Sequence, residues 1–229
     1  MENQTMPVGK LLLLVLSRFI PIMGVIFALL FLGAGTLDYW QAWVYLGMLV
    51  TVMIVFLVYL LIKDRALLER RMRMREKEGA QKKFLSISLL YFILLFFLPP
   101  LGYRFGWPQV PVWAVILADV IVLIGYGIVI WTMVTNSYAS RVVEVEKGQK
   151  VISTGPYAIV RHPMYLGNCL MYLMTPLALG SFWIMLLGLL FPLVLSMRIR
   201  NEEEVLTRDL EGYAAYKEKV KYRIIPGIW

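Results

Sequence analysis

Long apolar runs separated by shorter polar segments dominate the sequence. Six such runs lie at about 11–33, 42–62, 84–101, 112–134, 164–180 and 182–197. The run over 42–62 contains no charged residue, and a helix needs about 20 apolar residues to cross the hydrocarbon core of a bilayer. The pattern therefore predicts an all-α fold, a polytopic membrane helix bundle with about six apolar segments.

The last two apolar runs differ from the first four. Both are short, and only Gly180 and Ser181 separate them. They predict a short helical hairpin, either re-entrant or thinly spanning, with Pro176 and Pro192 bending its two arms. The charged segment that begins at Arg198 predicts an additional cytosolic C-terminal helix.

The basic residues are distributed unevenly between the two sides of this six-segment arrangement. Nine lie in 63–83, four in 135–163 and seven from residue 198 onward, whereas only Arg104 falls on the opposite side. Basic loops stay in the cytoplasm, so we expect a multi-pass protein with both termini cytoplasmic. The first run is too long for the apolar core of a signal peptide, so we interpret it as a span. The small size suggests a prokaryotic cell membrane.

Composition narrows the possible partners. The chain is 60% hydrophobic, with a mean hydropathy of +0.71, and its net charge of +8 is explained by topology and contact with anionic headgroups. Nucleic acid is therefore not expected as a partner. One cysteine, Cys169, and one histidine, His162, predict neither a disulfide nor a metal site. The lipid bilayer is an expected partner. The sequence does not indicate an oligomeric state.

Polar detail is concentrated in the second part of the chain. We therefore expect two regions: a transmembrane helical region of four spans over 1–134, and a cofactor-binding catalytic region over 135–229. One exception is Asp119, a carboxylate inside the fourth apolar run, which either forms a bond within the bundle or faces a cavity.

The segment before the fifth run is the first candidate site. Gly155-Pro156 indicates a turn, and Pro163 suits the first turn of a helix. Arg161 and His162 therefore lie at a helix N-terminus, where bare amides and the helix dipole favour an anion. The alternative is that these side chains contact lipid headgroups and cap the helix, with Tyr157 and Tyr165 in an interfacial aromatic belt.

The end of the sixth run is the second candidate site. Arg198 and Glu202 are four residues apart and share one helix face, while Glu203 is rotated away. Ionisable groups at membrane depth are costly and usually functional, although an amphipathic interfacial helix is the alternative. The predicted hairpin brings residues 157–165 and 198–203 to the same membrane face.

These residues carry a family resemblance. The motif G-P-Y-x-x-V-R-H-P-x-Y-x-G over 155–167, followed by R-I-x-x-E-E-x-x-L over 198–206, G-Y-x-x-Y over 212–216 and R-x-I-P over 223–226, resembles the isoprenylcysteine carboxyl methyltransferase family. The likeness covers about residues 135–226, and the glutamate pair extends it more broadly to the phospholipid N-methyltransferases. It implies S-adenosylmethionine as the cofactor and a lipophilic or prenylated substrate.

The resemblance also implies roles for individual residues. Arg198 would bind the substrate carboxylate, and Glu202 would contact the polar part of the cofactor. Glu203 or His162 would accept a proton if the acceptor were a cationic amine. The cofactor-binding residues implied are Gln149, Lys150, Val151, Ile152, Tyr157, Arg161, His162, Pro163, Met164, Tyr165 and Glu202.

Three alternatives to an isoprenylcysteine carboxyl methyltransferase stay open at this point. The acceptor could be a phospholipid amine, or the protein could be an NADPH-dependent membrane reductase of the sterol-reductase type, with a related hairpin. A structural membrane protein would bind neither cofactor. The sequence does not name the methyl acceptor.

Overall fold

The structure is a computed structural model that describes residues 6–72, 79–138, 145 and 148–229. Its described residues form helices and turns and contain no strand, so the predicted all-α class is confirmed. The elements are α1 (Val8–Ala34), α2 (Trp40–Lys63), α3 (Arg65–Arg71), α4 (Gly79–Arg104), α5 (Val112–Thr135), the 3-10 helix η1 (Gly155–Ala158), α6 (Pro163–Ala178), α7 (Met185–Gly188), α8 (Phe191–Asp209) and α9 (Tyr213–Lys219). The basic residues at 73, 75, 77, 141 and 147 lie outside the described residues.

Four of the described helices are long and apolar enough to cross a membrane. They are Val8–Ala34, Trp40–Lys63, Ser86–Arg104 and Val112–Thr135. They correspond to the first four apolar runs of the sequence. Many large apolar side chains on these helices are exposed, as expected for surfaces that face lipid. The structure thus supports a multi-pass membrane protein.

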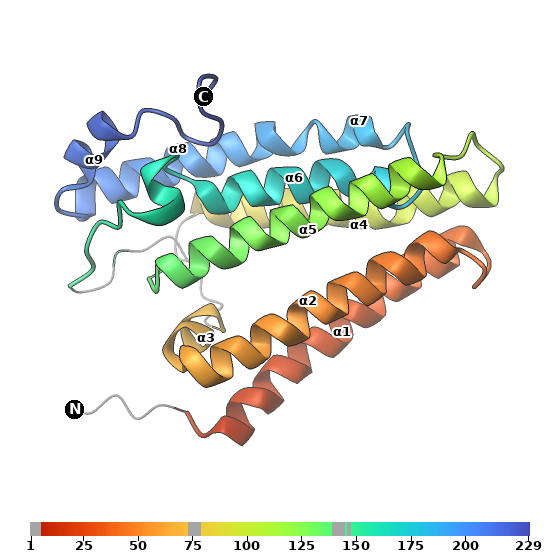
Figure 1. Ribbon diagram of the computed structural model, residues 1–229, viewed down its shortest axis with the longest axis horizontal. Helices are drawn as coiled ribbons and strands as arrows, with labels where there is room; N and C mark the ends of the chain where they lie inside the picture. The colour runs from red at the N-terminus through yellow and green to blue at the C-terminus, as the bar shows by residue number, and fades with distance from the viewer. Residues whose placement is uncertain (1–5, 73–78, 139–144, 146–147) are drawn as a thin grey trace.

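The helices run nearly side by side, and the polar elements gather at one end of the bundle (Figure 1). At that end, α5 finishes, η1 and the first turn of α6 begin, and α8 finishes next to α9. The short helix α3 lies at the same end, after α2. Segments far apart in the sequence therefore meet where the bundle is most polar.

Two glycines allow α5 and α6 to pack very closely. A Cβ at Gly167 would lie 2.6 Å from the Gly125 carbonyl oxygen, and a Cβ at Gly125 would lie 2.8 Å from that of Gly167. Small residues permit such close helix contacts in membranes. Gly127, two residues after Gly125 on α5, has no atom near its Cβ position. The Gly125–Gly167 contact fixes the first turns of α6 against α5.

The second half of the predicted hairpin differs from the expectation. The chain turns back after α6, passes through α7, and enters α8 at Phe191. Pro192 occupies the first turn of α8, so it does not bend this arm, because a proline there disrupts no helical hydrogen bond. Pro176 does lie inside α6.

The charged segment after residue 197 is also arranged differently. It continues α8 to Asp209, and the chain then breaks at Gly212, whose φ of +84° favours glycine. A separate short helix, α9, follows the break. Residues 198–209 are thus a rigid extension of the sixth apolar run, so Arg198 and Glu202 are held by one continuous helix.

Asp119 lies inside the bundle on α5. It is buried, and its Oδ1 atom has no hydrogen-bond partner among the described residues. Nearby polar groups do pair with each other: the Tyr45 and Thr175 hydroxyls are 2.8 Å apart, and Thr175 donates to the Met171 carbonyl. Of the two expectations for Asp119, a bond within the bundle is not observed among the residues that the structure describes.

Candidate functional site

A cavity lies at the polar end of the bundle, between η1, α6, α8 and α9. Its walls include each of the eleven cofactor-binding residues implied by the family resemblance, together with Arg198. Six further residues line it: Asn136, Tyr138, Leu206, Leu210, Tyr213 and Tyr216. Glu203, a catalytic candidate from the sequence, is not among the lining residues.

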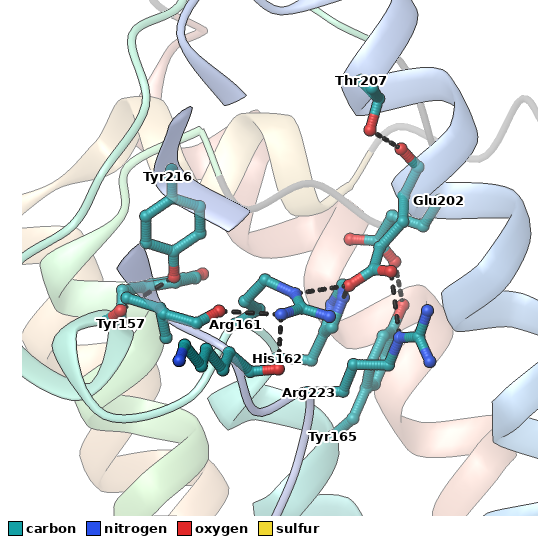
Figure 2. Close-up of polar contacts among 11 residues, drawn as sticks. Tyr157, Arg161, His162, Tyr165, Glu202, Thr207, Tyr216 and Arg223 are labelled. Atoms are coloured by element: carbon teal, nitrogen blue, oxygen red, sulfur yellow. Dashed lines mark hydrogen bonds and ion pairs between the residues drawn. The ribbon is translucent and has the colours of Figure 1, made fainter. Parts of the chain in front are cut away.

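Tyr165 joins the two polar clusters that the sequence singles out. Its hydroxyl donates to Glu202 Oε2 at 2.5 Å and accepts from Arg198 Nε at 2.8 Å. The ring of His162 stacks near that of Tyr165, with 5.6 Å between the ring centroids. The first turn of α6 and the polar half of α8 therefore form one wall of the cavity (Figure 2).

Glu203 lies behind this wall and binds three basic side chains. Arg161 Nε donates to Glu203 Oε1 at 2.6 Å, and His162 Nε2 lies 3.2 Å from the same oxygen. Arg223 Nε donates to Glu203 Oε2 at 3.0 Å. Glu203, His162 and Arg161 are only 3%, 5% and 8% exposed, so this is a buried ion cluster that links α8, the start of α6 and the C-terminal segment, residues 220–229 after α9.

The cluster keeps the Glu203 carboxylate ionised. Burial alone would raise the pKa of Glu203, but hydrogen bonds from His162, Arg161 and Arg223 outweigh burial and lower the pKa to about 2. A carboxylate with so low a pKa is a weak proton acceptor. Its geometry and pKa therefore favour a role in positioning Arg161 and His162.

The C-terminal segment pairs with the start of α6 through its backbone. The amides of Arg161 and His162 donate to the carbonyls of Tyr222 and Arg223, at 2.9 and 2.8 Å. Arg161 Nη1 also donates to the Val220 and Lys221 carbonyls. Because its guanidinium is satisfied by Glu203 and these carbonyls, Arg161 contributes to the cavity mainly by holding its floor in place.

Aromatic side chains form the opposite wall. Asn136 Nδ2 donates to the Tyr157 hydroxyl at 3.1 Å, and the Tyr216 hydroxyl donates to the Tyr157 carbonyl at 2.8 Å. Burial raises the pKa of Tyr157 to about 12, so its hydroxyl remains protonated. The Tyr213 hydroxyl is buried and has no partner within the described part of the chain, so a ligand could satisfy it.

The residues present fit S-adenosylmethionine. Glu202 supplies a carboxylate for an ammonium group, and the tyrosine rings supply electron-rich faces for a nucleobase or a cationic centre. The unsatisfied Tyr213 hydroxyl and the lining residues 149–152 supply polar atoms for a nucleoside. No group of histidine, cysteine and carboxylate side chains suited to a metal ion occurs among the residues that the structure describes.

Six of the lining residues are not predicted from the sequence to belong to the site. Leu206, Leu210, Tyr213 and Tyr216 recur at helical spacing, and this signal indicates a buried face without showing what covers it. Nothing in the sequence around Asn136 indicates that this residue belongs to the site. It reaches the site because α5 ends there.

Helix α3 also reaches the edge of the site. Arg70 Nη1 donates to the Ser137 carbonyl at 2.5 Å, and the Arg70 guanidinium lies 5.7 Å from the centroid of the Tyr138 ring. Arg71 Nη2 lies 3.9 Å from the Met164 sulfur, which lines the cavity. The basic loop predicted over 63–83 thus contains a helix that adds positive charge beside the cavity.

Four apolar helices with a polar cavity at one end of the bundle define a multi-pass membrane protein. A family model described as phospholipid methyltransferase matches residues 113–212, and this match supports a membrane methyltransferase. The match begins in α5, ends just before α9, and includes Arg161, His162 and Glu202. It confirms the methyltransferase resemblance predicted from the sequence.

Among solved structures, the chain is similar to a eukaryotic intramembrane Ras methyltransferase, an isoprenylcysteine carboxyl methyltransferase solved without a monobody. The sequences are 17% identical, the TM-score is 0.49, and the alignment covers 93% of this chain and 86% of that one. No curated protein matches the sequence.

Proposed function

We propose that the protein transfers a methyl group from S-adenosylmethionine to a lipophilic acceptor, with the carboxylate of an isoprenylcysteine-type substrate as the leading candidate. The observation that carries this proposal is the Arg198–Tyr165–Glu202 chain of hydrogen bonds on the cavity wall. It places the Arg198 guanidinium, which would bind an acceptor carboxylate, beside the Glu202 carboxylate, which would bind the ammonium group of the cofactor. Both lie on α8, one helical turn apart.

When bound, the cofactor supplies an electrophilic methyl group on a sulfonium. The protein's own contribution is positioning. Arg198 pairs with the acceptor carboxylate, Tyr165 fixes the Arg198 guanidinium, and Glu202 holds the cofactor's ammonium end. A carboxylate acceptor is already anionic, so no residue has to remove a proton. The apolar surroundings suit a reaction in which an anion and a cation yield neutral products.

An amine acceptor is the second candidate, because the matching family is described as phospholipid methyltransferase. An ammonium group must lose a proton before it can accept a methyl group. Glu202 is better placed than Glu203 to receive that proton, since Glu202 lines the cavity and Glu203 is held by three basic side chains. The neighbouring Arg71 and Arg198 favour an anionic acceptor over a cationic one.

The membrane location follows the same proposal. The lipophilic part of the acceptor would enter from the bilayer, and the cofactor would enter from water at the polar end of the bundle. We propose that this end, with the basic α3 and the C-terminal segment, faces the cytoplasm.

A radiolabelled methyl-transfer assay tests the proposal. Purified protein is supplied with methyl-labelled cofactor and either total membrane lipids or a synthetic prenylcysteine. We expect label with the wild type and with Glu204→Gln, a neighbouring exposed glutamate on α8. Glu202→Gln should lower turnover by up to about 100-fold, because the cofactor is misplaced. Mild base releases label from a methyl ester and leaves N-methyl label in place, which identifies the acceptor.

Two results would contradict the proposal. Equal turnover in Glu202→Gln and Glu204→Gln would remove Glu202 from the site. Binding of NADPH, without binding of S-adenosylhomocysteine in calorimetric titrations, would favour the reductase alternative.

A further inference from the structure

A second, open groove lies on the other side of α8 from the candidate methyl-transfer site. It is lined by Arg200, Glu203, Glu204, Thr207 and Arg208 of α8, Lys217 of α9, and Arg223 of the C-terminal segment. Arg198, Glu202 and Leu206 face the methyl-transfer cavity. Residues two positions further along a helix point about 200° away, so Arg200, Glu204 and Arg208 face the opposite direction.

The outer face of α8 changes from apolar to charged at the level of this groove. Leu193 and Met197 are 65% and 53% exposed, and Arg200, Glu204 and Arg208 follow at helical spacing on the same face and are also exposed. In a membrane protein, exposed large apolar side chains face acyl chains, and exposed cations lie at the headgroups. The groove therefore begins where lipid tails end along this helix.

Two of the four basic side chains in the groove, Arg200 and Lys217, are not paired with an acid of the described residues, and the exposed Glu204 carboxylate also lines the groove. Glu203 is neutralised by the buried cluster of Arg161, His162 and Arg223, and Arg208 binds the Asp209 carboxylate through two nitrogens. The side chains of Arg200 and Lys217 make no hydrogen bond or ion pair with any residue that the structure describes. Four basic and two acidic side chains line the groove, so its lining is cationic.

The C-terminal segment adds an apolar rim. Tyr222, Ile225 and Ile228 are exposed on either side of Arg223. Apolar side chains that alternate with cations are typical of a surface lying in the headgroup region, where the apolar parts insert and the charges contact phosphates.

We propose that this groove binds the phosphate of an anionic phospholipid headgroup, with Arg200 and Lys217 as its main ligands. A lipid bound there keeps its acyl chains along Leu193 and Met197, in continuity with the exposed apolar face of α8. This site is separate from the methyl-transfer cavity and does not depend on the methyl acceptor.

A lipid titration of the full-length protein in non-ionic detergent tests the proposal. Thermal unfolding is followed as phosphatidylglycerol, phosphatidylcholine with the same acyl chains, or inorganic phosphate is added. We expect phosphatidylglycerol to raise the melting temperature at a lower concentration than phosphatidylcholine or inorganic phosphate does. The double variant Arg200→Gln with Lys217→Gln should weaken phosphatidylglycerol binding by about 10- to 30-fold, from the usual contribution of two basic residues near an anionic surface.

The matched control is Lys63→Gln with Arg65→Gln, which removes the same charge from the end of α2 and the start of α3. This control should bind phosphatidylglycerol like the wild type. The proposal is overturned if phosphatidylcholine binds as tightly as phosphatidylglycerol, or if both double variants weaken binding equally. It is also overturned if inorganic phosphate binds as tightly as the lipid, because the groove would then be a site for free phosphate.

Discussion

The substitution Glu203→Gln separates a structural role of this residue from a catalytic one. It keeps the shape of the side chain and removes the charge that Arg161, His162 and Arg223 share. Hydrogen bonds to a charged group contribute about 1 kcal/mol more than neutral ones, so the loss over three bonds is about 3 kcal/mol. The lowered pKa of Glu203, about 2, gives a similar upper bound of about 3 kcal/mol.

Thermal unfolding in detergent measures this loss. For a chain of this size, 1 kcal/mol corresponds to about 2–4 °C, so the melting temperature of Glu203→Gln should fall by about 6–12 °C. Glu204→Gln is the control, since Glu204 is its exposed neighbour on α8. If both variants unfold at the same temperature, the charge of the buried cluster does not stabilise the fold.

The pH dependence of stability provides a second test of Glu203. Because folding lowers its pKa from 4.5 to about 2, Glu203 stabilises the protein above pH 4.5. This contribution is lost as the pH falls toward 2, where the carboxylate is protonated in both states. The free-energy difference between wild type and Glu203→Gln should therefore shrink over that interval. A difference that does not change with pH would refute the assignment.

Two further substitutions test the site wall and the helix contact that supports it. Tyr165→Phe removes the hydroxyl between Arg198 and Glu202, so methyl transfer should fall by up to about 100-fold with little change in melting temperature, and unchanged turnover would show that this hydroxyl has no positioning role. Gly167→Ala places a Cβ 2.6 Å from the Gly125 carbonyl oxygen and should lower the free energy of unfolding by about 1–3 kcal/mol in thermal unfolding. Gly127→Ala, with no atom near its Cβ, is the control and should be neutral or stabilising; equal loss in both would contradict the close α5–α6 contact.

The sequence predicted the membrane class and most of the cavity lining, for different physical reasons. Apolar runs of sufficient length define spans because the bilayer has a fixed thickness. The cavity residues came from a motif whose members lie on short, rigid pieces: the first turn of α6 and one continuous helix, α8. Residues on such helices keep their relative positions independently of the loop conformations.

Long-range contacts could not be predicted in this way. The pairing of the Arg161 and His162 amides with Tyr222 and Arg223 joins residues about 60 positions apart, and no local periodicity encodes it. Arg71 reaches Met164 only because α3 is folded back toward the site. These contacts depend on tertiary packing, which the pattern of apolar and polar residues does not specify.

The two adjacent glutamates show how one helical step divides the proposed roles. Glu202 and Glu203 differ in direction by about 100° around α8. Glu202 lines the cavity and accepts a hydrogen bond from Tyr165, whereas Glu203 points into a buried group of basic side chains. A glutamate carboxylate on one face of α8 can therefore bind a ligand, and one on the neighbouring face can hold the basic residues behind the cavity in place. Glu202 and Glu203 have the same chemistry but different surroundings, and for this reason only Glu202 should affect turnover directly.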